Sequence, residues 1–284
     1  MKKQTKRSAF TLIELSIVLV IIGLILGGIL VGQELISAAQ IRDSISQIEK
    51  YKTAAYTFRS KYNAIPGDIN SSSASGFGLI YRSGDDGHGD GDGMIEGCSG
   101  AATTAGCENI LFWSDLSFAR LISDPFTSAT DGLSYMASNA DFTSFAANFS
   151  MVSDAQAMAG PSPVSKDLLI PQSRLGAGNY VVVFTAQGKN YLQVTGVVST
   201  DSSGNYTLSD LITPYQASSI DSKLDDRWPL TGSVLAMGGT GPLNVLAVPG
   251  TNSCVYNVGS PAPYNMHTSA LSNGRLCQLR FNLD

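Results

Sequence analysis

The stretch FTLIELSIVLVIIGLILGGILVGQ, residues 10–33, decides the fold of this chain. From residue 15 to residue 33 it contains no charged residue, and most of its side chains are Ile, Leu or Val. A helix of this length rises about 30 Å, at roughly 1.5 Å per residue, which is close to the thickness of the hydrocarbon in a bilayer. The stretch therefore predicts a helix that spans a membrane.

The residues before this stretch are basic. Lys2, Lys3, Lys6 and Arg7 precede it, and residues 1–9 contain no acid. Flanking positive charge keeps that end of a membrane helix in the cytoplasm. The sequence therefore predicts a single span with a cytoplasmic N-terminus and an exported chain after residue 34.

Three kinds of segment share this pattern: a cleaved secretory signal, a simple signal anchor, and an anchor with a further function. A secretory signal ends at a small-residue site, and only Ser37-Ala38-Ala39 offers one, inside a polar continuation of the helix. Glu14 argues against both simpler alternatives, because a carboxylate in a membrane costs roughly a few kcal/mol and usually has a partner or a function. We expect a positive group to neutralise Glu14.

Residues 8–15, Ser-Ala-Phe-Thr-Leu-Ile-Glu-Leu, resemble the cleavage and methylation motif of type IV pilins and type II secretion pseudopilins. The resemblance implies that a prepilin peptidase cuts after Ala9 and that the new amine of Phe10 is methylated. It also implies that Glu14 pairs with the N-terminal amine of a neighbouring pilin or pseudopilin subunit, so that two costly charges neutralise each other. The family more often has glycine where Ala9 stands, and often has a helix proline that this chain lacks.

An amphipathic pattern continues the helix beyond the membrane run. Apolar residues recur at spacings of three and four: Ile41, Ile45, Ile48, Tyr51, Ala55, Phe58 and Tyr62. The spacing predicts a helix over residues 10–62 that ends before Pro66-Gly67. We expect its outer half to bury this face against a globular domain and its apolar inner half to bind other subunits. Because the helix lacks the family's proline, we expect glycines to make it less rigid instead: Gly27, Gly28 and Gly32.

The chain thus divides into a leader (1–9), a transmembrane and assembly helix (10–62) and an exported domain (63–284). The predicted fold class is α+β, with the long helix packed on a domain that contains an antiparallel sheet. Within the domain the patterns predict a helix over 108–122, a hairpin of strands 179–186 and 191–198, a strand over 206–211 and a helix over 213–226.

The last of these helices has a clear start signal. Thr213 is the predicted N-cap and Pro214 the first helical residue. Asp221 and Asp225 lie four residues apart on one face, where we favour a packing helix with solvated acids over a cation site. Residues 126–175 show no pattern that predicts a particular structure.

Residues 84–96, GDDGHGDGDGMIE, alternate carboxylates with glycines. Such a loop can wrap oxygen ligands around a calcium ion, and its end fits the middle of a calcium loop. The predicted ligands are Asp86, His88, Asp90, Asp92 and Glu96. The match is partial, because His88 takes the place of the first carboxylate and Ser99 that of the closing one. The alternatives are a flexible acidic loop and a zinc site through His88.

Four cysteines, an even number, follow the predicted span: Cys98, Cys107, Cys254 and Cys277. They can form two disulfides if the domain is exported, although the sequence leaves all three connectivities open, and free buried thiols are the alternative. A loop closed by Cys254 and Cys277 resembles the disulfide-bounded region that many type IV pilins display.

Composition and missing motifs argue against other classes. Net charge is −5 and the basic residues cluster only at the N-terminus, so we predict no nucleic-acid partner. The only histidines are His88 and His267, and no nucleophile elbow or phosphate loop is present, so we predict no enzyme and no cofactor beyond calcium.

The resemblance implies a structural subunit of a type IV pilus or a type II secretion pseudopilus, and the size of the exported domain favours a minor or specialised one. Such a protein is stored in the bacterial inner membrane with its domain in the periplasm, and forms filaments after assembly. The alternative is a membrane-anchored periplasmic binding protein or hydrolase with a pilin-like anchor.

Overall fold

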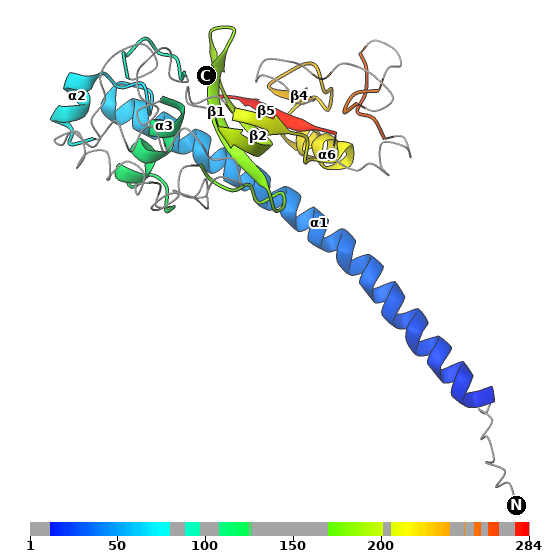
Figure 1. Ribbon diagram of the computed structural model, residues 1–284. Helices are drawn as coiled ribbons and strands as arrows, with labels where there is room; N and C mark the ends of the chain where they lie inside the picture. The colour runs from blue at the N-terminus through cyan, green and yellow to red at the C-terminus, as the bar shows by residue number, and fades with distance from the viewer. Residues whose placement is uncertain are drawn as a thin grey trace, which may run out of the picture.

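The computed structural model describes residues 12–79, 89–96, 108–124, 126, 170–200, 206–238, 247, 253–256, 261–266 and 276–283. A long helix extends from a globular domain that combines a small sheet with further helices (Figure 1). The predicted α+β class is confirmed.

Helix α1 (Leu12–Tyr62) is continuous over 51 residues, which corresponds to about 77 Å at 1.5 Å per residue. All of its glycines are α-helical, so the positions at which we expected a less rigid helix do not interrupt it. The helix ends where the sequence predicted. Asn63 adopts a left-handed conformation with φ 53° and donates its N–H to the Arg59 carbonyl at 2.9 Å, a common way to close a helix.

The outer half of α1 packs into the domain. Its buried residues are Ile41, Ser44, Ile48, Tyr51, Ala54, Ala55 and Phe58, which follow the predicted apolar stripe. Tyr51 contacts Trp113 edge-to-face, with ring centroids 4.9 Å apart. The stripe therefore anchors the helix in the core, as the spacing of its apolar residues predicted.

The sheet is antiparallel throughout. The strand order is β1-β2-β5-β4, and β3 pairs with the C-terminal part of β2. The strands are β1 (Asn179–Ala186), β2 (Lys189–Thr200), β3 (Tyr206–Ser209), β4 (Val234–Met237) and β5 (Gln278–Asn282). Strand β5, from the end of the chain, lies in the middle of the sheet because it pairs with both β2 and β4.

The β1–β2 hairpin confirms the sequence prediction with a tighter turn. The prediction left four residues between the strands, whereas Ala186 pairs directly with Lys189. Gln187 and Gly188 form the turn with φ 52° and 71°. Two positive φ angles give a turn whose twist matches that of the strands, and this explains why β2 begins two residues earlier than predicted. Strand β3 is two residues shorter than predicted.

Helix α3 (Glu108–Phe118) ends four residues before the predicted end. Arg120 adopts φ 58°, and two backbone bonds close the helix behind it: Arg120 N–H to Ser117 O and Leu121 N–H to Leu116 O. This is a Schellman motif. The chain after the motif turns back to the core, where Ile122 is buried. The apolar periodicity therefore extends beyond the end of the helix, which made the predicted helix too long.

Helix α6 (Pro214–Leu224) begins as predicted. The Thr213 side chain accepts from the backbone N–H of Gln216, and the Gln216 side chain accepts from the backbone N–H of Thr213, which completes a capping box. The helix packs against α1 and beside β4. A further short helix, α2 (Ser71–Gly76), was not predicted.

Candidate functional site

The inner half of α1 carries most of the exposed large apolar side chains among the described residues. Its large side chains are exposed by 46–88%: Leu12, Ile13, Leu15, Ile17, Val18, Leu19, Val20, Ile21, Ile22, Leu24, Ile25, Leu26, Ile29, Leu30, Val31, Leu35 and Ile36. By length and composition α1 can cross a membrane. In Figure 1 this half projects away from the domain. An apolar surface of this size requires lipid or protein around it.

The uncovered part of α1 is longer than the hydrocarbon core of a bilayer is thick. Burial by the domain begins at Ile41, so residues 12–40 extend free of it for about 44 Å, against roughly 30 Å of hydrocarbon. The excess falls on residues 33–40, which carry the charged Glu34 and the exposed Leu35 and Ile36. A membrane spanned by α1 would therefore leave residues 33–40 between its hydrocarbon and the domain.

Glu14 lies in the first described turn of α1 and is exposed. A carboxylate near a helix N-terminus interacts favourably with the helix dipole, and here it lies at the start of a long apolar run. Ala9 and Phe10, the predicted cleavage and methylation residues, lie outside the described residues.

Residues 4–30 match the family model described as "Prokaryotic N-terminal methylation motif". This is the type IV pilin and pseudopilin signature. The match covers about a tenth of the chain, and it supports a pilin-like or pseudopilin-like protein without identifying a system. The signature implies processing by a prepilin peptidase and assembly with other pilin-type subunits, and together with the apolar helix it fits anchoring in an inner membrane. Searches of curated proteins and of solved structures gave no match for the chain.

The acidic loop is organised around two carboxylates that the sequence analysis did not include. Asp68 accepts the backbone N–H groups of Gly91 and Gly93, both at 2.8 Å. Glu108, the first residue of α3, accepts those of Gly89 at 2.7 Å and Glu96 at 3.0 Å. Residues 89–96 are therefore fixed by their own backbone on two buried acids, 2% and 1% exposed.

Asp68, Asp90 and Glu108 form an acidic cluster, each with one carboxylate oxygen within 4.8 Å of the others. The pKa of Asp68 is raised to about 6 and that of Glu108 to about 8, mainly by burial and also by the neighbouring carboxylates, although the backbone N–H groups that each accepts oppose the shift. The ion pairs found among the described residues, Lys50–Asp124 and Lys52–Glu49, lie elsewhere. A cation, or a shared proton, would relieve the repulsion within this cluster.

The predicted calcium ligands that the structure describes have different roles. Asp86 and His88 lie outside the described residues. Asp90 belongs to the acidic cluster, whereas Asp92 accepts the Met94 N–H at 2.7 Å in a local turn. Glu96 contributes its backbone N–H to Glu108. The position of each buried acid in the chain was the signal that could have pointed to it. Asp68 directly follows the Pro66-Gly67 turn, and Glu108 is the first residue of a helix.

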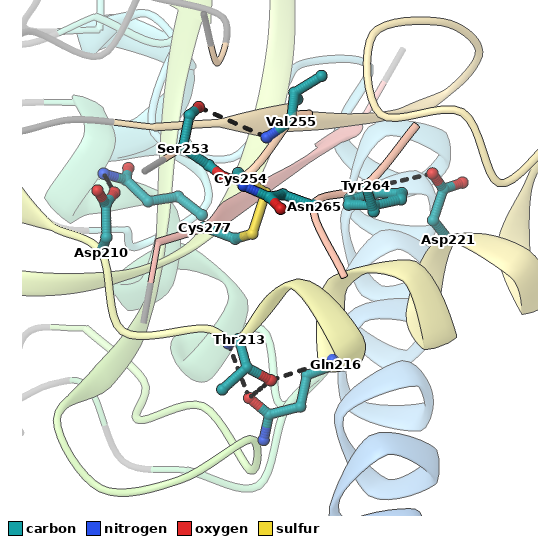
Figure 2. Close-up of a disulfide and its surroundings, with 11 residues drawn as sticks. Asp210, Thr213, Gln216, Asp221, Ser253, Cys254, Val255, Tyr264, Asn265 and Cys277 are labelled. Atoms are coloured by element: carbon teal, nitrogen blue, oxygen red, sulfur yellow. Dashed lines mark hydrogen bonds between the residues drawn. A yellow bond between two sulfur atoms is a disulfide. The ribbon is translucent and has the colours of Figure 1, made fainter. Parts of the chain in front are cut away.

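Cys254 and Cys277 form a disulfide, one of the pairings that the sequence left open. Cys98, Cys107 and His267 lie outside the described residues. Cys254 precedes Val255, which forms an isolated β-bridge with Tyr264, and Cys277 directly precedes β5. The disulfide therefore links this bridge to the start of β5. Figure 2 shows the Tyr264 hydroxyl directed at Asp221 of α6, to which it donates at 2.7 Å. The C-terminal region is thereby tied both to the sheet and to α6.

The second group of acids, Asp221, Asp225 and Asp226, serves the turn after α6. Asp221 accepts the Arg227 N–H at 3.2 Å, and Asp225 accepts the N–H groups of Ser233 and Val234. Asp226 accepts from the Trp228 N–H at 2.8 Å. These bonds agree with the expectation of a packing helix, since each carboxylate accepts backbone N–H groups of this chain. The expectation of solvated acids is wrong for Asp221, which is fully buried.

Proposed function

We propose that this chain is a structural subunit, minor or specialised, of a type IV pilus or a type II secretion pseudopilus. The observation that carries the proposal is the division of α1. Its inner half is exposed and apolar and bears the methylation motif, while its outer half is embedded in the domain. A helix built in this way stores the subunit in the inner membrane, with a cytoplasmic N-terminus, and assembles it after processing.

The proposed mechanism joins processing to assembly. Cleavage after Ala9 exposes a new amine on Phe10, which is then methylated and keeps its positive charge. In the filament this amine faces Glu14 of a neighbouring subunit, and the pair replaces two charges that would each be costly in an apolar surrounding. The same apolar side chains that contact lipid in storage then contact the neighbouring helices.

Processing is tested by the mass of the full chain extracted from membranes. The wild type is expected to lack residues 1–9 and to carry one added methyl group, and Ala9→Trp to remain uncut. Ala39→Trp is the matched control, because Ala39 ends the alternative small-residue site and is exposed in α1. Normal processing of Ala9→Trp, or loss of cleavage in Ala39→Trp, would favour a secretory signal and a periplasmic binding protein or hydrolase.

We also propose that the acidic cluster takes a calcium ion, with oxygen ligands from Asp68, Asp90 and Glu108. Two of these carboxylates are buried, and the cluster has no basic partner in the ion pairs found among the described residues. Carboxylate oxygens are the ligands that calcium prefers. Bound calcium would fix the loop 89–96 against α3 and leave the role of α1 unchanged.

A further inference from the structure

The outer half of α1 has an exposed face beside the stripe that packs into the domain. Lys52, Tyr56 and Arg59 are spaced by four and three residues, so they lie on the same side of the helix. Tyr56 is 46% exposed, Arg59 is exposed and Lys52 is half-buried. We call these three residues the outer face of α1. It lies on the same helix as the apolar inner half, and its side chains are open to another molecule.

The charges of the chain are divided unevenly between this part of α1 and the domain that follows. Residues 41–63 contain five basic residues and two acidic ones, whereas residues 64–284 contain nine basic residues and nineteen acidic ones. Arg59 and Lys61 lie in the last turn of the helix, where positive charge suits the helix dipole. The dipole does not account for Lys52, which lies further from the end. The outer half of α1 is therefore a basic element on an acidic domain.

Contacts within the chain use only part of this positive charge. The ion pairs found among the described residues join Lys50 to Asp124 at 3.7 Å and Lys52 to Glu49 at 4.0 Å. Neither pair includes Arg59. The carboxylate in the second pair belongs to α1 itself, so the acidic excess of the domain does not neutralise the outer face within one copy.

We propose that a second copy of this chain docks on the outer face of α1 through the acidic surface of its domain. Complementary charge identifies this occupant, because the excess of acids lies in the domain of the same chain, where Asp92 and Asp226 are exposed. Tyr56 supplies a large exposed ring between the two cations, and tyrosine and arginine are enriched in protein interfaces. A basic surface that meets an acidic one makes a head-to-tail contact, which can repeat along a filament.

The inference rests on the proposed function and adds the identity of a neighbour to it. A subunit that binds its own copies occupies adjacent positions in a filament. The contact therefore favours a specialised filament of this chain over a minor subunit placed singly among others. Exposed charges are screened by salt, so the wild-type filament should lose subunits as the salt concentration rises.

Carbodiimide cross-linking of isolated filaments tests the contact, because this reagent joins a lysine amine to a carboxylate only where the two groups meet. Cells shifted from light to heavy nitrogen give filaments that contain copies of two masses. We expect cross-linked peptides of mixed mass that join Lys52 or Lys61 to acids after residue 63. Same-mass links between Lys50 and Asp124 are the internal control, since these side chains lie 3.7 Å apart within one copy.

Charge reversal gives an independent measurement. Arg59→Glu should lower the amount of the chain in filaments by about twofold to fivefold, the size expected for exposed ion pairs. Lys189→Glu is the matched control, because it makes the same change in charge at an exposed residue of the β1–β2 hairpin. This control should assemble at the level of the wild type.

The outcomes separate this inference from the proposed function. Filaments that contain the chain but give only same-mass links would overturn the contact between copies and leave the proposed function standing. Links from Lys52 and Lys61 to a different protein, or assembly of Arg59→Glu at the wild-type level, would do the same. Absence of the chain from filaments would overturn both.

Discussion

Gly67 and Glu108 lie in direct backbone contact. A β-carbon on Gly67 would overlap the carbonyl oxygen of Glu108, and Gly67 has φ +88°. The Gly67 N–H donates to the buried Asp115 carboxylate at 2.7 Å. This contact places Asp68, the next residue, beside the first turn of α3. The acidic cluster therefore depends on a turn that only glycine fits.

We expect Gly67→Ala to lower the free energy of unfolding by about 2–4 kcal/mol, because the new methyl group must displace backbone and the left-handed conformation is unfavourable for alanine. Gly76→Ala is the matched control, since no atom lies within 4 Å of its added β-carbon. Denaturant unfolding of the full chain in detergent measures both. Equal effects in the two variants would contradict the close contact.

Removal of calcium tests the acidic cluster. Thermal unfolding of chelator-treated chain should shift to higher temperature when calcium is added back, and Asp68→Asn or Glu108→Gln should abolish the shift. Asp92→Asn should retain it, because Asp92 lies outside the cluster. If the wild type shows no shift and no heat of binding by calorimetry, the loop is held by the two buried acids alone, and the proposed role of α1 is unaffected.

Asp221 predicts a pH dependence of stability. Burial raises its pKa to about 6, and its bonds with Tyr264 and Arg227 only partly oppose that shift. The folded protein therefore holds this proton more tightly than the unfolded chain, and the stabilisation is complete below about pH 4 and is lost as pH rises through about 6.

Asp221→Asn removes this titration. The free energy of unfolding of the variant, relative to the wild type, should rise by on the order of 2 kcal/mol between about pH 4 and about pH 7. The measurement is denaturant unfolding of both chains across that range. Parallel curves would show that Asp221 does not titrate with a raised pKa.

The disulfide gives a further prediction. Cys254 and Cys277 are 23 residues apart, so opening the loop should lower the free energy of unfolding by about 3 kcal/mol in the chain-entropy account. We expect this loss in the double variant Cys254→Ser with Cys277→Ser, measured by denaturant unfolding. Full stability in that variant would mean that the bond adds nothing beyond the Tyr264–Asp221 contact.

Local signals in the sequence predicted the elements that local interactions define. The stripe that includes Ile48 and Phe58 predicted the outer half of α1, and Thr213-Pro214 predicted the start of α6. The turn between β1 and β2 was placed correctly but made too long, because the left-handed conformation of Gln187 has no clear sequence signal. Helix α3 ended before its predicted end for the same reason, because nothing in the sequence indicates that Arg120 adopts a left-handed conformation.

Long-range pairing was not predictable from the sequence. Strand β5 has only five residues, QLRFN, which alternate between polar and apolar side chains, so a short strand signal was missed there. Nothing in that alternation indicates that β5 pairs with both β2 and β4. Asp68 and Glu108 meet across 40 positions of chain, and no spacing rule connects them. The disulfide partner of Cys254 was likewise one of several possibilities until β5 was placed in the sheet.

The central claim is tested most directly by the amount of this chain in isolated filaments, with Glu14→Val compared with Glu34→Val. Both acids are exposed on α1, at opposite ends of its apolar run. We predict that Glu14→Val is produced and cleaved but absent from filaments, while Glu34→Val assembles at the level of the wild type. Glu14→Val in filaments at the wild-type level would contradict assembly through α1.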